Sequence, residues 1–151
     1  NHSVHDTRPE FANLEKYPNA KHHFPVTVES FFASENFESI CRFSDILLLG
    51  HDWSEDQDRL LGLLHLFSEN KAIPDGRSAP RIGVIGSRSK WQAFEKECIN
   101  NGLEQHLLDN VICPIGLNIG AESPEEIAVA VVAQIMALFK ETDAESPTWR
   151  N

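Results

Sequence analysis

The residues with the clearest chemical potential lie in one ten-residue stretch, 81–90, which reads Arg-Ile-Gly-Val-Ile-Gly-Ser-Arg-Ser-Lys. Its apolar first half is typical of a strand that is covered on both faces. Gly86 permits a tight exit from the strand, and Ser87 or Ser89 can cap the helix that we expect to begin near Trp91. The stretch therefore predicts a strand, a glycine turn and a helix start in immediate succession.

Two positive charges, Arg88 and Lys90, fall at this helix start. Backbone N–H groups point outward there, and the helix dipole favours negative charge. Together with Gly86, Ser87 and Ser89, the two cations would form a cradle for an anion such as a phosphate. The alternative is a surface turn whose Arg and Lys are solvated, and the residues alone leave both interpretations open.

His51 and Asp52 follow a second apolar strand, which we expect over 45–49. The carboxyl ends of parallel strands line the ligand crevice in open α/β sheets, so both residues are candidate catalytic groups. His51 would be the general base. In the alternative interpretation both residues satisfy the turn before a helix, with Ser54 as its cap.

Cys113 is a third catalytic candidate, because it ends a short strand beside a glycine-punctuated loop. The alternative is that Cys113 is a small residue of the core, where free cysteines are usually found.

Asp6 also ends a short strand, at 3–6. In a dinucleotide-binding fold an acidic residue there binds a ribose hydroxyl. The glycine fingerprint that should precede it is absent, since the first glycine is Gly50, and a turn-forming Asp6 is the alternative.

Strands and helices alternate along the chain. A helix with apolar residues at helical spacing follows each of the strands at 45–49 and 81–85, and Ser123-Pro124-Glu125-Glu126 starts a third, apolar helix that should be deeply buried and run to Phe139. This pattern predicts an α/β fold, a parallel sheet with helices on both faces. We expect a single domain over 1–141 and a flexible polar tail over 142–151.

Composition narrows the function classes. The 151 residues carry a formal net charge of −10, which argues against non-specific binding to nucleic acid or to anionic membranes. The apolar run 127–139 is too short to span a bilayer. Three cysteines without a CxxC spacing favour a reducing, cytoplasmic location. The adjacent His22 and His23 would point to opposite sides of a strand, so no metal site is expected.

Several segments together resemble one family. They occur in the expected order and are Asp6-Thr7-Arg8-Pro9-Glu10-Phe11, Gly50-His51-Asp52, Ile85-Gly86-Ser87-Arg88-Ser89-Lys90, Cys113-Pro114-Ile115-Gly116-Leu117-Asn118-Ile119-Gly120-Ala121 and Ser123-Pro124-Glu125-Glu126-Ile127-Ala128. The set is similar to the C-terminal Rossmann-like domain of the xanthine dehydrogenase accessory factor family (XdhC/CoxI). The resemblance covers about residues 4–139.

The resemblance implies a maturation role rather than turnover of a metabolite. Family members are thought to bind the molybdenum cofactor, assist its sulfuration and deliver it to an apo molybdenum hydroxylase such as xanthine dehydrogenase. A cysteine desulfurase is a further implied partner, and an NAD(P)-binding oxidoreductase-like domain is the alternative function. The implied cofactor-binding residues are Asp6, Arg8, Gly86, Ser87, Arg88, Ser89, Lys90, Gly116, Asn118 and Gly120.

The chain departs from the family pattern in three respects. The glycine-rich first strand and turn, which would precede Ser3, are not present, and neither is the family's separate N-terminal domain. Gly50 stands where Thr is common, and Asn118 where Asp is common. A sheet without its central first strand has an open edge or a gap. We therefore expect a homodimer that completes the sheet, or a missing N-terminal portion supplied separately.

Overall fold

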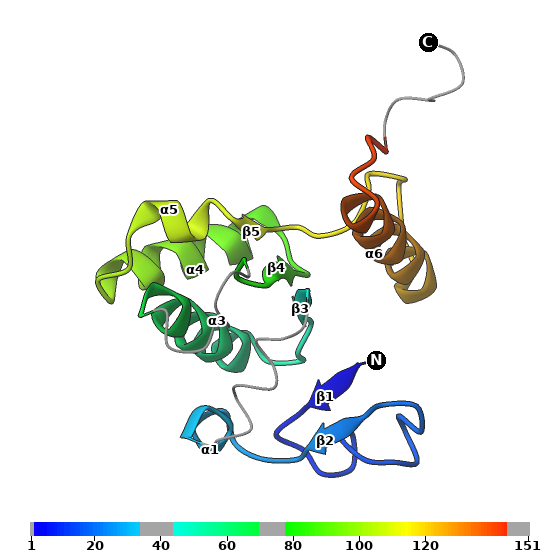
Figure 1. Ribbon diagram of the computed structural model, residues 1–151, viewed down its shortest axis with the longest axis horizontal. Coiled ribbons are helices and arrows are strands. Elements are labelled where there is room, and N and C mark those ends of the chain that lie inside the picture. The colour runs from blue at the N-terminus through cyan, green and yellow to red at the C-terminus, as the bar shows by residue number, and fades with distance from the viewer. Residues whose placement is uncertain (1, 34–43, 70–77, 145–151) are drawn as a thin grey trace.

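The computed structural model of the chain describes residues 2–33, 44–69 and 78–144. Its elements are shown in Figure 1 and are β1 (Ser3–His5), β2 (His22–Phe24), α1 (Val28–Ala33), β3 (Asp45–Leu48), α3 (Trp53–Ser68), β4 (Arg81–Val84), α4 (Arg88–Asn100), α5 (Gln105–Leu108), β5 (Val111–Ile112) and α6 (Pro124–Phe139).

The described strands form two sheets. β1 and β2 pair in parallel with Ser3 opposite His22, and β3, β4 and β5 form a parallel sheet in that order, with Asp45 opposite Arg81 and Ile82 opposite Val111. All paired strands are thus parallel. Helices connect β3 to β4 and β4 to β5, whereas turns connect β1 to β2. The parallel strands and the helices between them confirm the predicted α/β class. Within the described residues no strand pairs with both β1 and β3, so the two sheets stay separate.

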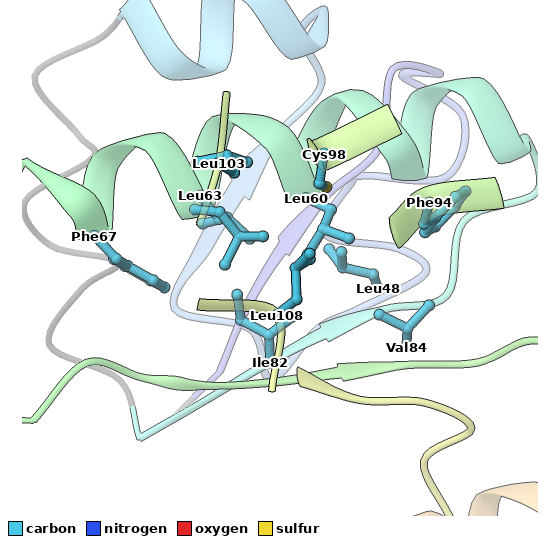
Figure 2. Close-up of a cluster of buried hydrophobic side chains, with 11 residues drawn as sticks. Leu48, Leu60, Leu63, Phe67, Ile82, Val84, Phe94, Cys98, Leu103 and Leu108 are labelled. Carbon is cyan, nitrogen blue, oxygen red and sulfur yellow. The ribbon is translucent and has the colours of Figure 1, made fainter. Parts of the chain in front are cut away.

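One face of the three-stranded sheet carries the core. Three helices, α3, α4 and α5, cover it, as Figure 2 shows for their side chains. β3 and β4 contribute alternate residues to this face because strand side chains have a period of two. The buried cluster consists of Leu48, Leu60, Leu63, Leu64, Phe67, Ile82, Val84, Phe94, Cys98, Leu103 and Leu108.

The opposite face is covered in part. Gly83 of β4 leaves room for Ile115, since a Cβ on Gly83 would lie 2.3 Å from Ile115 Cδ1. Beside it, however, Leu47 is 37% exposed and Leu49 is 56% exposed. The apolar strand expected over 45–49 is present as β3, which ends at Leu48 and is buried less than its apolar sequence suggests, because no described element covers the face that carries Leu47.

Helix α6 begins as predicted but is buried less than predicted. Ser123 and Glu126 form a full capping box, and the helix ends at Phe139. Only Ala130 and Val131 are buried, because these residues face the loop around Gly116. The helix leaves an apolar stripe exposed, which consists of Val129, Val132, Met136 and Phe139.

Two other helix starts differ from expectation. α4 begins at Arg88, and the Ser87 hydroxyl accepts a hydrogen bond from the Lys90 amide. α3 begins at Trp53 and is capped by Asp52, not by Ser54. Neither of these helices, nor any other helix in the described ranges, is long and apolar enough to cross a membrane.

Candidate functional site at the carboxyl ends of the strands

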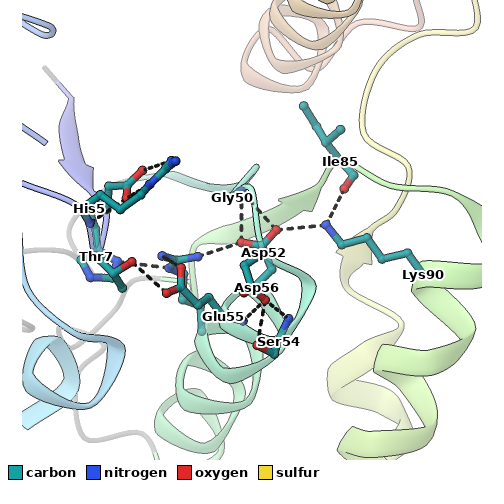
Figure 3. Close-up of polar contacts among 12 residues, drawn as sticks. His5, Thr7, Gly50, Asp52, Ser54, Glu55, Asp56, Ile85 and Lys90 are labelled. Atoms are coloured by element: carbon teal, nitrogen blue, oxygen red, sulfur yellow. Dashed lines mark hydrogen bonds and ion pairs between the residues drawn. The ribbon is translucent and has the colours of Figure 1, made fainter. Parts of the chain in front are cut away.

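The carboxyl ends of β3 and β4 meet at a buried carboxylate, Asp56 of α3, which is 0% exposed. Its Oδ2 lies 3.0 Å from the ammonium of Lys90, and the same ammonium donates to the carbonyl of Ile85 at 3.0 Å. Both Asp56 oxygens also lie 3.1 Å from the amide of Gly50 (Figure 3). The Asp56 side chain thus binds both Gly50, which follows β3, and Lys90, which follows β4.

Arg59 extends the network to β1. Its Nη1 is 3.0 Å from Asp56 Oδ1, and its Nε donates to Nδ1 of His5 at 3.2 Å. Nε2 of His5 lies 2.9 Å from the carbonyl of Val26. Burial lowers the pKa of His5, in keeping with a neutral ring whose Nδ1 accepts a hydrogen bond. Arg59 therefore joins the end of the two-stranded sheet to the three-stranded sheet.

Glu55, in the first turn of α3, binds the turn that follows β1 at the same junction. Thr7 donates to its Oε1 at 2.8 Å, and Arg59 Nη2 lies 3.4 Å from its Oε2. We name the whole set the Asp56 network; its members are His5, Thr7, Gly50, Glu55, Asp56, Arg59, Ile85 and Lys90.

Two glycines make room for this network. A Cβ on Gly50 would lie 2.6 Å from Asp56 Oδ1, and a Cβ on Gly86 would lie 2.5 Å from Lys90 Cδ. Carbon atoms in real structures do not approach so closely, so a side chain at either position would displace the ion pairs. Gly86 is needed to pack Lys90, a reason that the sequence alone did not reveal.

Lys90 therefore does not lie where the sequence interpretation placed it. We expected an outward-facing cation beside Arg88, but Lys90 is 4% exposed and its ammonium has two partners. The reason is helical geometry: Lys90 turns toward the core side of α4, in line with Phe94, whose ring centre is 5.3 Å from the ammonium. Its positive charge is neutralised within the fold.

The other residues of the expected cradle remain accessible. Ser87, Arg88 and Ser89 are exposed at the N-terminus of α4, directly after β4. Ser87 satisfies the Lys90 amide, whereas the amides of Arg88 and Ser89 have no acceptor within the described ranges. Arg88 likewise forms no ion pair with a described residue. This corner keeps one cation and two amide donors for an anion.

Asp6 and Arg8 come together at the end of β1. The guanidinium binds the carboxylate with two hydrogen bonds of 3.0 Å, and the Arg8 amide donates to Asp6 at 2.9 Å. Hydrogen bonds from Arg8 lower the pKa of Asp6, so the carboxylate is ionised. Arg8 also lies over the ring of Phe11, 3.9 Å from its centre.

The structure gives Asp52 the role of a helix cap. Its Oδ1 accepts from the Ser54 amide at 2.7 Å, from the Ser54 hydroxyl at 2.7 Å and from the Glu55 amide at 3.4 Å. These hydrogen bonds, chiefly the ones from Ser54, lower the pKa of the carboxyl group. His51 is exposed beside it. His51 is thus accessible to solvent. The contacts of Asp52 are those of the alternative interpretation, in which this carboxylate accepts hydrogen bonds in the turn before the helix.

Cys113 is half-buried at the end of β5. Burial raises the pKa of its thiol, and the charge of Lys90 offsets this only in part. Cys98 is fully buried in the core, and the pKa of its thiol is raised to about 11. Both groups are thiols near neutral pH, whereas a nucleophilic cysteine needs the thiolate.

The glycine loop after β5 is fixed against α6. Gln134 accepts from the Gly116 amide at 2.6 Å, and Leu117 donates to the carbonyl of Ala130 at 3.1 Å. Gly116 and Gly120 have φ values of +121° and +71°, a region that favours glycine. Asn118 is exposed between them. The structure gives this candidate group a rigid backbone and an accessible amide side chain.

Sequence reasoning missed Asp56, Arg59, Glu55 and His5. A signal was present, because Asp56 is in phase with Leu60, Leu63 and Phe67 on the buried stripe of α3. A charged residue on an apolar stripe is rarely buried unless it is paired. That pattern points to a partnered carboxylate, although it does not say which cations bind it.

The order of the strands locates the site within the fold. The strands β1 and β3 line one cavity from two sides. β2 pairs with β1 in the first sheet, and β4 and then β5 follow β3 in the second, so the strand order reverses between β1 and β3. Open α/β sheets bind ligands at such a switch point, beyond the carboxyl ends of the strands. The residues that the sequence singled out at 6, 8, 51, 52 and 86–89 all follow β1, β3 or β4. The class of protein is therefore a Rossmann-like α/β domain.

The particular family follows from comparison with known proteins. Residues 1–135 match the XdhC Rossmann domain, and the chain belongs to this family. It is similar to a probable xanthine dehydrogenase subunit of Bacillus subtilis, with 29% identity over 137 residues, which cover 91% of this chain and 35% of that protein.

The chain is also similar to a second bacterial protein and to a solved structure. The "Uncharacterized protein YqeB" of Escherichia coli is 38% identical over 55 residues, which cover 36% of this chain and 10% of that protein. A crystal structure of a xanthine dehydrogenase from Bacillus halodurans superposes with a TM-score of 0.64 at 24% identity, over 92% of this chain and 36% of that one, and it supports the fold. The chain spans about a third or less of the length of these relatives.

Proposed function

We propose that this domain acts as an accessory domain in the maturation of xanthine dehydrogenase or a similar molybdenum hydroxylase. In this proposal it binds the molybdenum cofactor, holds it during sulfuration and transfers it to the apo hydroxylase, without turnover of a metabolite. Family membership and the similarity to a probable component of xanthine dehydrogenase support the hydroxylase context.

The observation that carries cofactor binding is the open corner at Ser87, Arg88 and Ser89. The molybdenum cofactor bears a phosphate, or a dinucleotide in its extended form. Two amide donors and an exposed guanidinium at the N-terminus of α4 fit such a group. Asn118 and the backbone at Gly116 and Gly120 follow the next strand, β5, and would contact the pterin or its linker. The metal of the delivered cofactor then supplies the hydroxylase with its redox centre.

The Asp56 network serves this site by holding the strand ends. Asp56 fixes the Gly50 amide, and Lys90 fixes the Ile85 carbonyl, so the turns that precede α3 and α4 keep one arrangement. A preorganised anion site binds more tightly because little ordering remains to be done on binding. Lys90 thus acts as a positioning residue, and Arg88 makes the contact with the anion.

The test is a titration of tryptophan fluorescence with isolated molybdenum cofactor under anaerobic conditions. Trp91 lies in the first turn of α4, three residues from Arg88, and reports on the corner. A charge-assisted hydrogen bond contributes about 1.5–3 kcal/mol, so Arg88→Glu should weaken binding about 10- to 150-fold. Lys96→Glu makes the same change of charge at an exposed position of α4, about 12 Å along the helix, and should bind like the wild type.

NAD(H) and NADP(H), titrated in parallel, distinguish the second candidate function. Asp6 follows β1 at the position where a dinucleotide-binding fold holds a ribose hydroxyl, which favours an NAD(P)-binding, oxidoreductase-like domain. Saturation by a nicotinamide dinucleotide and none by the molybdenum cofactor would establish that alternative. Equal binding of the molybdenum cofactor by the wild type and by Arg88→Glu would refute the role of the α4 corner.

A further inference from the structure

Helix α6 exposes an apolar stripe that no described part of the chain covers. Val129, Val132, Met136 and Phe139 are between 53% and 72% exposed, and we name these four residues the α6 stripe. From Ile127 to Phe139 the helix has no charged residue. Figure 1 shows α6 apart from the other helices. A helix that is apolar on nearly all sides is normally covered on all of them, so the α6 stripe marks an interaction surface.

The spacing of the α6 stripe is that of a seam between two helices. Its members recur after three, four and three positions, which is the alternation of a and d positions in a heptad repeat. The other side of the helix is held by the domain, where Ala130 and Val131 face Gly116 and Gln134 binds the Gly116 amide. A helix has 3.6 residues per turn, so these residues point away from the stripe. The α6 stripe can therefore receive a second helix without any rearrangement of the domain.

Side-chain sizes along the α6 stripe match those of a second α6 stripe that runs in the opposite direction. A two-fold axis midway between Val132 and Met136 sets these two residues opposite each other, and it sets Val129 opposite Phe139. Each layer then joins a small side chain to a large one, an arrangement that fills the space between helices. A parallel pair would instead place every residue opposite its own copy, with two Phe139 rings in one layer.

The charges at the two ends of the helix also favour the antiparallel pair. Glu125 lies four residues before Val129, on the line of the α6 stripe, and Lys140 follows Phe139 at the opposite end. The same two-fold axis brings Lys140 of one copy to within three residues of Glu125 of the other, about 4.5 Å along the helix direction. A parallel pair would place two Glu125 carboxylates in one layer, where like charges repel.

We propose that the α6 stripe is the contact between two copies of this chain, which associate through a two-fold symmetric, antiparallel pair of α6 helices. The contact leaves both sheets as they are, so it differs from a dimer that completes the sheet. One helix face is smaller than the roughly 800 Å² that each partner buries in a standard interface. The association should therefore be reversible, with a dissociation constant in the micromolar to millimolar range.

Sedimentation equilibrium of the chain 1–151 tests the contact. Over protein concentrations from about 5 µM to about 1 mM, which span the affinities of such weak interfaces, the average mass should rise from 17.0 kDa toward twice that value. Met136→Glu puts a carboxylate into both central layers and should raise the dissociation constant at least tenfold. Ile99→Glu makes a similar change on the exposed side of α4, where Ile99 is 43% exposed, and should associate like the wild type. Urea midpoints measured at low concentration, expected to equal that of the wild type, establish that both variants fold.

A charge exchange tests the direction of the helices. Glu125→Lys sets two lysines beside each other in the antiparallel pair and should weaken association severalfold. Adding Lys140→Glu restores the opposite charges and should recover it. A parallel pair would show no recovery, because both positions would still face their own copies, and that result would overturn the antiparallel arrangement.

Two results would overturn the contact itself. A chain that stays at 17.0 kDa over the whole concentration range would leave the α6 stripe to a different protein. A dimer that Met136→Glu does not weaken would place the contact elsewhere on the molecule.

Discussion

Among the charged side chains of the domain, Asp56 should contribute most to the free energy of unfolding. The substitution Asp56→Asn keeps the shape of the side chain and removes its charge. It leaves Lys90, 4% exposed, and Arg59, 8% exposed, without their shared buried counter-charge. Removing one partner of a buried ion pair typically costs about 3–5 kcal/mol. A domain of this size has a total stability of about 5–15 kcal/mol, so the variant would lose a large fraction of it.

Urea unfolding followed by circular dichroism measures this loss. With a slope of about 2 kcal/mol per M, the midpoint should fall by about 1.5–2.5 M. Asp45→Asn is the matched control, because Asp45 binds Arg81 at 2.7 Å but both side chains are partly exposed. Exposed pairs contribute about 0–1 kcal/mol, so the control midpoint should fall by at most about 0.5 M.

A double variant refines the argument. Asp56→Leu with Lys90→Met replaces the buried pair by apolar groups, and such replacements are often tolerated better than a single loss. We expect the double variant to be more stable than Asp56→Leu alone, which gives a non-additive cycle. Two results would refute a strongly coupled buried pair of Asp56 and Lys90. One is a loss of unfolding free energy in Asp56→Asn no larger than that in Asp45→Asn, and the other is additivity of the losses from the changes at positions 56 and 90.

Three further outcomes follow from the contacts described. The fold lowers the pKa of His5 from 6.5, so the unfolded chain binds a proton at His5 before the folded chain does as the pH falls. The free energy of unfolding should therefore decrease below about pH 6.5. His5→Gln should flatten this decrease in urea midpoints measured from pH 7.5 to 5. Ser123→Ala removes half of a capping box and should cost about 1 kcal/mol, measured by thermal unfolding, whereas Ser89→Ala, at an exposed non-capping position, should cost less than about 0.5 kcal/mol. Gly83→Ala places a Cβ against Ile115 and should cost about 1–3 kcal/mol, and Ile115→Val should recover part of that cost if the contact is the cause.

The sequence was sufficient for the parts of the fold that depend on local patterns. Alternating strands and helices predicted the parallel α/β class, and the run Ser123 to Glu126 predicted the start of α6. Ser87 and Ser89 were both proposed as caps, and the structure uses Ser87; the pattern could reveal a cap because capping is decided within one turn of helix. Each of these features is encoded by residues that lie close together in the chain.

The parts that the sequence did not reveal depend on distant partners. Lys90 looks like a surface cation until Asp56, which lies 34 residues earlier, is placed beside it. Asp52 was ambiguous between a catalytic group and a cap, and only its observed contact with the Ser54 amide shows its structural role. The open outer face of β3 was missed because an apolar run such as 46–49 does not say whether one face or both faces are covered.

The break between the two sheets also divides the domain into units of unequal cooperativity. Residues 3–33 are joined to the rest of the described chain through side chains and not by a ladder of backbone hydrogen bonds. Phe32 of α1 packs against α3 beside Gly62, Arg59 binds His5, and Thr7 binds Glu55. A partial unfolding that releases β1, β2 and α1 would leave the core of α3, α4 and β4 intact. Such openings require less free energy than global unfolding. Limited proteolysis would therefore cut first in the N-terminal unit, and a fragment from residue 44 onward would persist as the resistant core.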